Sequence, residues 1–188
     1  MSPSKPAVSA PAVFLALGSN LGDRRGHLAQ AGAALGAAPG IRLVAASSLY
    51  ATAPVGLPGE PEFLNAVVEI RTELAPEALL QTCLEIERGL GRVRDAAAPK
   101  GQWRSRPIDI DVLLWGELRQ ASPTLTVPHP RLQERAFVLL PLAEIAPGWR
   151  LEGRTIAEWA AASDASGVRR LPGGAAWIVR ESRPAGPR

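Results

Sequence analysis

A short run near the middle of the chain, from Pro107 to Gly116, constrains the fold more than any other stretch. Apolar and β-branched side chains fill it, so it is predicted to be a β-strand that ends at the glycine. Because successive side chains of a strand point to opposite faces, its apolar residues are expected on one face and its acids on the other. The apolar set is Ile108, Ile110, Val112 and Leu114, and the acids are Asp109 and Asp111.

The two acids predict a cation site. Carboxylates about 7 Å apart along one face of a strand repel each other unless a positive charge lies nearby. Such a pair suits Mg²⁺, which takes one or two carboxylates and completes its shell with water and phosphate oxygens. Arg104 and Arg106 precede the acids and can fork onto phosphate, so the set indicates phosphoryl-type transfer. The alternative is a solvated strand whose acids simply pair with these arginines.

The basic residues also indicate a ligand that carries phosphate. The chain has 21 lysines and arginines and a formal net charge of +3. Lys5 and Lys100 are its only lysines, and arginine is the better residue for gripping phosphate. A nucleotide ligand is therefore expected, with nucleic acid as an alternative. Neither of the two common glycine-rich phosphate loops occurs, so arginines and metal must build the site.

Length and cysteine content limit the architecture and the compartment. A chain of 188 residues that is 46% hydrophobic can form one domain with a sizeable core. Its single cysteine, Cys83, excludes a disulfide within the chain and favours a reducing cytosol. The apolar run 12–17 is too short to cross a membrane or to act as a signal peptide. We expect a soluble, cytoplasmic protein with no membrane and no nucleic-acid partner.

Hydrophobic periodicity predicts a mixed α and β chain. Residues 1–11 read as a disordered leader, 12–165 as a single domain, and 166–188 as an extension that forms a hairpin and then a disordered tail. The loop at 95–101 is a candidate lid. Strands are expected at 13–17, 41–50, 63–71 and 108–115. The first helix is expected from Asn20 or Asp23 to 35, and the second from Pro76 to Gly89 or Gly91. A third is expected around 131–145, with Pro141 kinking or dividing it, and a fourth at 155–163, where a capping box begins it.

Three further residues carry alternative interpretations. Phe63 and Asn65 share one face of their strand and could hold a flat heterocycle, or could equally be plain core and a polar group near a turn. His129 lies between two prolines that restrict its backbone, which suits a binding residue. A lone histidine is nevertheless more often structural.

Six blocks together resemble the 6-hydroxymethyl-7,8-dihydropterin pyrophosphokinases of folate synthesis, over residues 13 to 148. They occur in order and with plausible spacings. The blocks are FLALGSNLG at 14–22, SSLY at 47–50 with Thr52 and Pro54, FLN at 63–65, GRVR at 91–94, RPIDID at 106–111 and VPHPR at 127–131.

The resemblance implies a ferredoxin-like α/β sandwich with a mainly antiparallel sheet, and transfer of pyrophosphate from ATP to the pterin hydroxymethyl group with release of AMP. Two Mg²⁺ ions bound by Asp109 and Asp111 are implied, with Arg92 and Arg106 neutralising the moving group. The implied ATP side is Glu87, Arg94, Arg106, Ile110, Thr126, His129 and Arg135. The implied pterin slot is Thr52, Val55, Phe63, Asn65, Trp103, Asp109 and Phe137, with the two phenylalanines sandwiching the ring and Trp103 on a closing loop.

Some positions depart from the family pattern. Arg104, Leu84 and Thr124 differ from the family's usual residues in ways that could weaken ATP binding. Two alternatives stay open: a catalytically weak nucleotide- or metal-binding relative on this fold, and an RNA-binding ferredoxin-like module, which the acids on the sheet face disfavour. A monomer is expected, with docking to other folate-pathway enzymes as a further expectation.

Overall fold

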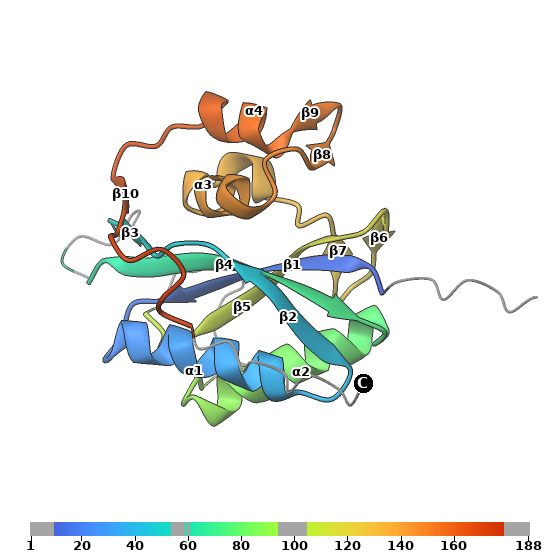
Figure 1. Cartoon of the computed structure of the whole chain (residues 1–188). Helices are drawn as coiled ribbons and strands as arrows, with labels where there is room; N and C mark the ends of the chain where they lie inside the picture. Colours follow the sequence, from blue (N-terminus) through green and yellow to red (C-terminus); the bar gives the residue numbers. More distant parts are fainter. Residues whose placement is uncertain (1–9, 54–58, 60, 94–104, 179–188) are drawn as a thin grey trace, which may run out of the picture.

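The computed structural model describes residues 10–53, 59, 61–93 and 105–178. An antiparallel sheet with strand order β10-β3-β4-β1-β5 forms its centre, and β2 also pairs with β4. Helices α1 and α2 cover one face of this sheet, and α3 and α4 lie over the other (Figure 1). The bounds are β1 Ala12–Ser19, α1 Arg24–Ala37, β2 Ile41–Ala46, β3 Tyr50–Thr52, β4 Phe63–Thr72, α2 Pro76–Gly89, β5 Asp109–Trp115, α3 Ala136–Ile145, α4 Ile156–Ala162 and β10 Val168–Arg170. This arrangement confirms the expected ferredoxin-like α+β fold.

Short elements complete the chain. Two small hairpins, β6–β7 and β8–β9, lie outside the main sheet. Within the described part of the chain, every helix is too short or too polar to cross a lipid bilayer. The remaining bounds are β6 Gln120–Ala121, β7 Thr126–Val127, η1 Leu132–Glu134, β8 Arg150–Leu151 and β9 Arg154–Thr155.

Two hydrophobic cores lie on the two faces of the sheet. On the α1 and α2 face, alternate residues of β1 such as Leu15 pack with Leu28 and Leu79 of the helices. On the α3 and α4 face, Phe14 packs with Leu139 and Ile156. Strand β1 is central and buried on both faces, which explains its nearly continuous apolar sequence.

Local signals placed most helix boundaries correctly. Asp23, rather than Asn20, caps α1 by accepting a hydrogen bond from the Gly26 N–H at 2.9 Å. Thr155 and Glu158 form the expected capping box of α4. Pro141 lies inside α3 without dividing it. Arg131 and Arg135 flank the short helix η1, so the expected helix over 131–145 is two helices, with α3 beginning at residue 136.

Three expectations about strands were wrong. The strand predicted over 41–50 breaks after β2, where the Ser47 hydroxyl accepts from the Val67 N–H at 2.9 Å and shifts the pairing on β4. A bulge in the β1–β5 pairing turns Leu114 to the α3 face, away from Ile110. In place of the expected C-terminal hairpin, β10 pairs with β3, and the described residues 172–177 form turns.

Candidate active site

A pocket opens on the α3 face of the sheet, over β1, β3, β4 and β5. It brings together eight of the side chains that the sequence analysis predicted for the site, although they come from segments far apart in the chain. Its lining is Ala16, Leu17, Gly18, Thr52, Ala53, Phe63, Asn65, Ala66, Arg106, Asp109, Asp111, Arg135, Phe137 and Val138.

Small residues of β1 form the floor of the pocket. Gly18 lies directly opposite Asn65 on one side and Asp109 on the other. A Cβ atom at Gly18 would lie 3.1 Å from Asn65 Oδ1, which is tight. Along this face of β1 the side chains shrink from Phe14 through Ala16 to Gly18, and the pocket occupies the space that they leave. Sequence reasoning did not identify this floor, although the decrease in size could be read from alternate positions.

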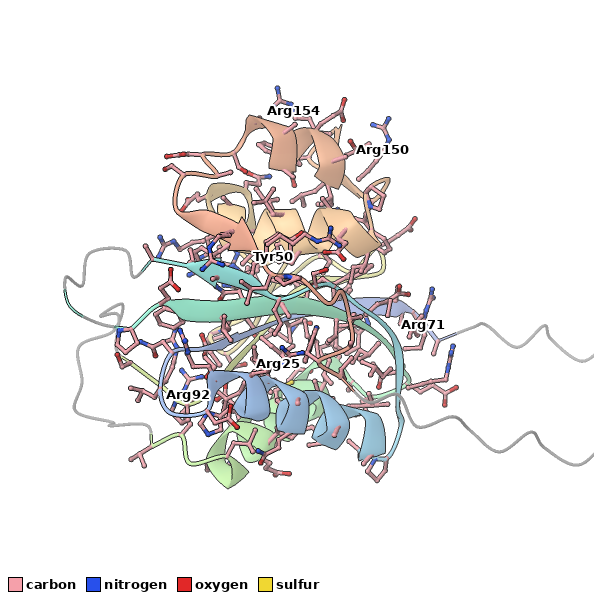
Figure 2. The ribbon with its side chains drawn as sticks, turned by 60° about the vertical axis from the view of Figure 1, so that its left-hand side comes forward. Arg25, Tyr50, Arg71, Arg92, Arg150 and Arg154 are labelled. Atoms are coloured by element: carbon pink, nitrogen blue, oxygen red, sulfur yellow. The ribbon has the colours of Figure 1, made fainter. Side chains whose placement is uncertain are left out.

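Arginines from three segments hold the two acids of β5. Asp109 is bound by Arg92, which follows α2, and by Arg106 at 2.9 Å. Arg135, immediately before α3, lies 3.5 Å from Asp111 Oδ2. Figure 2 shows Arg92 at the end of the sheet beside α2. The acids therefore share their pocket with guanidinium groups that could instead bind phosphate.

The electrostatics of Asp111 favour a bound cation. Its side chain keeps 38% of its surface exposed toward the pocket. Burial of the carboxyl group, together with the negative charge of Asp109, nevertheless raises its pKa to about 6. A positive ion would remove this penalty, since it favours the ionised form of both acids.

His129 faces the same acid. Its Nε2 lies 4.0 Å from Asp111 Oδ2, and its Nδ1 accepts a hydrogen bond from the Arg131 N–H at 3.1 Å. Burial, with the charges of Arg135 and Arg131, lowers the pKa of His129 to about 4. The ring is therefore neutral at pH 7, and the contact at Nδ1 assigns its proton to Nε2, which can donate a hydrogen bond.

Glu87 is buried behind the acids and has structural contacts. It is 1% exposed, accepts the Ile110 N–H at 2.8 Å and binds Arg92 at 2.6 Å. It thus connects the end of α2 to β5 and orients Arg92 toward Asp109. The lining of the pocket does not include Glu87, Ile110, Thr126 or His129, four of the residues expected on the ATP side.

The opposite end of the pocket has aromatic and amide groups. Asn65 Nδ2 donates a hydrogen bond to Thr52 Oγ1 at 2.7 Å, which orients both side chains. The guanidinium carbon of Arg106 lies 5.9 Å from the centroid of Phe63, and that of Arg135 lies 5.8 Å from the centroid of Phe137. Flat groups can stack in such surroundings.

Asn20 is a site residue that sequence reasoning missed. The fully buried side chain accepts from the Arg106 N–H at 2.7 Å and donates to Ser105 Oγ at 2.8 Å. Its own N–H donates to the Arg106 carbonyl oxygen at 3.2 Å. Asn20 therefore fixes the backbone from which Arg106 reaches Asp109. Its place directly after a buried strand was the available signal.

The metal prediction fits the donors in the pocket. Among the described residues, no group of three or more His, Cys, Asp or Glu side chains could hold a metal ion. A pair of carboxylates is sufficient for Mg²⁺ when water and phosphate supply the other ligands. Of the residues expected in the site, Val55, Arg94 and Trp103 lie outside the described residues, as do Arg104 and the candidate lid.

Comparison with known proteins identifies the family. A sequence model of the 7,8-dihydro-6-hydroxymethylpterin-pyrophosphokinase (HPPK) family matches residues 14–147. The chain belongs to the HPPK family. The resemblance inferred from the six blocks is thereby confirmed, and every proposed site residue lies inside the matched range.

Relatives of the HPPK family cover most of the chain. A 2-amino-4-hydroxy-6-hydroxymethyldihydropteridine pyrophosphokinase of Methylorubrum extorquens is 48% identical over 158 residues, which are 84% of this chain and 97% of that protein. The enzyme of the same name from Pseudomonas aeruginosa is 45% identical over 162 residues, 86% of this chain and 97% of that protein.

A solved structure supports the HPPK fold. Plasmodium falciparum HPPK-DHPS with pteroate matches with a TM-score of 0.62 at 15% identity, over 81% of this chain. The chain spans 42% of that fused protein. At this identity the likeness concerns the fold alone.

Proposed function

We propose that the protein transfers the pyrophosphoryl group of ATP to the hydroxymethyl oxygen of 6-hydroxymethyl-7,8-dihydropterin and releases AMP, as a step of folate synthesis. The observation that carries the proposal is one pocket in which two acids and two arginines, Arg106 and Arg135, lie beside an amide and two aromatic rings. A third arginine, Arg92, binds Asp109 from outside this lining. The charged end suits a triphosphate, and the amide and aromatic end suits a flat pterin ring. Membership of the HPPK family supports the same reaction.

Asp109 and Asp111 are the proposed ligands of two Mg²⁺ ions. When bound, the ions supply positive charge that neutralises the triphosphate and polarises the oxygens that react. Asp109 pairs with arginines in the present structure. We infer that the phosphate oxygens of ATP draw these arginines away and leave the carboxylate free.

Arg92 and Arg106 are the proposed charge-stabilising residues. Phosphoryl-type transfer passes through a loose transition state, so positioning and charge neutralisation supply most of the acceleration. Both side chains reach the same carboxylate, and neither is more than 21% exposed. Glu87 orients Arg92 and Asn20 orients the backbone of Arg106. Their preorganisation reduces the entropy that each arginine loses when it binds phosphate.

Thr52, Asn65, Phe63 and Phe137 are the proposed pterin residues. The amide of Asn65 offers a donor and an acceptor to the hydrogen-bonding edge of the ring. Phe63 and Phe137 offer faces for stacking once the guanidinium groups near them bind phosphate. We further propose that Arg94, Thr126, His129 and Arg135 contribute to the ATP side, and that Val55 and Trp103 complete the pterin side.

Three broader predictions accompany this function. We expect a cytoplasmic protein and a monomer. The fused HPPK-DHPS relative joins this fold to a second part, so docking with other folate-pathway enzymes is also a prediction for this chain.

Product analysis tests the proposed function. The purified protein is supplied with ATP, Mg²⁺ and 6-hydroxymethyl-7,8-dihydropterin, and the nucleotides are separated by chromatography. The proposal predicts AMP and an equal amount of pterin diphosphate. Formation of ADP, or no reaction that depends on the pterin, would contradict it.

A further inference from the structure

A row of paired residues crosses the whole sheet and reaches the site from its far edge. Arg170 of β10 pairs with Tyr50, Tyr50 with Asn65, Asn65 with Gly18, and Gly18 with Asp109. Directly paired residues project from the same face of a sheet, which here is the face toward α3. The row therefore connects the pocket to a C-terminal strand that lies beyond residue 147, where the family match ends.

A cluster of polar residues, some buried and some exposed, surrounds the Arg170 end of this row. Glu144 of α3 accepts hydrogen bonds from the Ser48 N–H at 3.1 Å, the Ser48 hydroxyl at 2.8 Å and the Tyr50 hydroxyl at 3.0 Å. Arg170 donates to Glu144 at 3.0 Å and, through Nε, to Ser48 Oγ at 3.0 Å. Figure 2 shows Tyr50 between β3 and the ribbon of α3. The cluster thus joins α3, β3 and β10.

Strand β3 depends on β10 for its outer support. It is three residues long, and β4 binds its other side. At its ends the Ala53 N–H donates to the Gly167 carbonyl at 3.3 Å, and the Leu171 N–H donates to the Leu49 carbonyl at 2.8 Å. Without β10, the very short strand β3 would form the edge of the sheet. Strand β3 carries Thr52, whose hydroxyl oxygen accepts the hydrogen bond from the Asn65 amide.

We propose that Arg170 is a positioning residue for the pterin side of the site, an inference that rests on the proposed function. Arg170 binds Glu144 near the C-terminal end of α3, whereas Phe137, near its N-terminal end, lines the pocket. By holding α3 against β3, Arg170 fixes the spacing between Phe137 and the Thr52–Asn65 pair. The charged end of the pocket is held separately, by Asn20 and Glu87. Arg135, at the start of α3, is also bound to Asp111 of β5. Arg170 therefore governs pterin affinity more strongly than ATP affinity.

Steady-state kinetics with each substrate varied in turn test this inference. The Arg170→Ala variant is expected to raise the KM for the pterin about fivefold, which corresponds to about 1 kcal/mol for a partly exposed charged contact. The KM for ATP is expected to stay within about twofold of the wild-type value, which is below 0.5 kcal/mol. Arg170→Lys keeps the charge but loses the Nε contact with Ser48. Its KM for the pterin should therefore lie between those of the wild-type protein and Arg170→Ala.

Arg169→Ala is the matched control, because it removes an arginine from the same strand. Among the described residues, the side chain of Arg169 makes a 3.6 Å ion pair with Glu62, and both side chains are at least half exposed. Its pterin KM is expected to match that of the wild-type protein. Pterin binding is also measured by fluorescence titration in the presence of a non-hydrolysable ATP analogue, so that affinity is obtained without turnover.

The outcomes separate this inference from the proposed function. If the wild-type protein produces no AMP, the proposed function fails. If it produces AMP, but Arg170→Ala changes both KM values equally, or changes neither, the positioning role is wrong. If Arg170→Ala does not fold, Tyr50→Phe replaces it, since that change removes one hydrogen bond to Glu144. An unchanged pterin KM in Tyr50→Phe would then overturn the proposal.

Discussion

Asp109 illustrates how the neighbours of a residue decide its chemistry. Alternation along a strand predicted that it shares a face with Asp111, and this is what the structure shows, since both line the pocket. Pairing of the acids with Arg106, three residues before Asp109, was the alternative interpretation of the sequence. The contact between Arg92 and Asp109 could not be predicted from the strand pattern, because Arg92 comes from a different segment. The contacts of Asn20 with Arg106 were not predictable for the same reason, since 86 positions separate the two residues.

The first prediction at this scale concerns the acids. Asp109→Asn and Asp111→Asn each remove one negative charge while keeping the shape of the side chain. Each is expected to lower kcat by about 10² to 10³, the range observed when one charge-stabilising group is lost. AMP formation measures the rate, and circular dichroism checks the fold. Glu85→Gln, on the exposed side of α2, is the control. Near wild-type turnover in either aspartate variant would refute the metal assignment.

The second prediction concerns Asn20. Replacing it with alanine leaves the Arg106 N–H and the Ser105 hydroxyl without their buried partner, at a cost of about 1–3 kcal/mol in the free energy of unfolding. We also expect a lower kcat, because the backbone that carries Arg106 becomes less ordered. Ser105→Ala removes only the outer contact and should have the smaller effect on both quantities. Equal effects of the two variants on kcat would contradict the role assigned to Asn20.

At the scale of elements, the sequence predicted those helices, strands and caps that depend on residues close together in the chain. The strand of the two acids, helix α2 with Leu79 and Cys83 inside, and the capping box of α4 all follow from periodicity and from residues close in sequence. The break after β2, the bulge between Val112 and Leu114 and the pairing of β10 depend on partners elsewhere in the chain. Periodicity contains no information about such partners, which is why these features were missed.

Helix α1 and the C-terminal segment give a prediction of coupling between elements. A Cβ atom at Gly32 would overlap Ile178 Cδ1, so the glycine makes room for the segment that follows β10. Gly32→Ala gains about 1 kcal/mol of helix propensity but loses about 1–3 kcal/mol through overpacking. Urea unfolding of both single variants and the double variant is expected to show that Ile178→Ala costs less when residue 32 is alanine. Additive changes would contradict the packing.

The cluster around Glu144 gives a prediction of pH dependence. Burial alone raises the pKa of its carboxyl group, but hydrogen bonds from Ser48 and Tyr50 and the charge of Arg170 outweigh burial and hold the pKa below its ordinary value of 4.5. Such an acid stabilises the fold above the pKa that it has when unfolded, and this stabilisation is lost as pH falls through the folded pKa.

Glu144→Gln tests this dependence. The Tm of the variant is expected to lie below that of the wild-type protein at pH 7, and the difference should shrink as pH falls below about 4.5. Calorimetry across this range measures both. A difference in Tm that is constant with pH would contradict a role for the ionised carboxylate.

At the scale of the whole molecule, the sheet has one role on each face. The α1 and α2 face is packed core, and the α3 face combines a second core with the pocket, where β1 narrows to Gly18. Arg150 and Arg154, in contrast, lie at the outer side of the molecule near α4, away from the pocket (Figure 2). The arginine-rich composition correctly suggested a phosphate ligand but could not tell site arginines from such surface ones, because only the fold distinguishes them.

The most direct test of the account is the number of divalent ions bound at the acids of β5. Mn²⁺, which can replace Mg²⁺ in oxygen-ligand sites, is titrated by electron paramagnetic resonance into the protein with a non-hydrolysable ATP analogue. The account predicts two bound ions per chain in the wild-type protein and fewer in both Asp109→Asn and Asp111→Asn. Unchanged Mn²⁺ binding in these variants would contradict it.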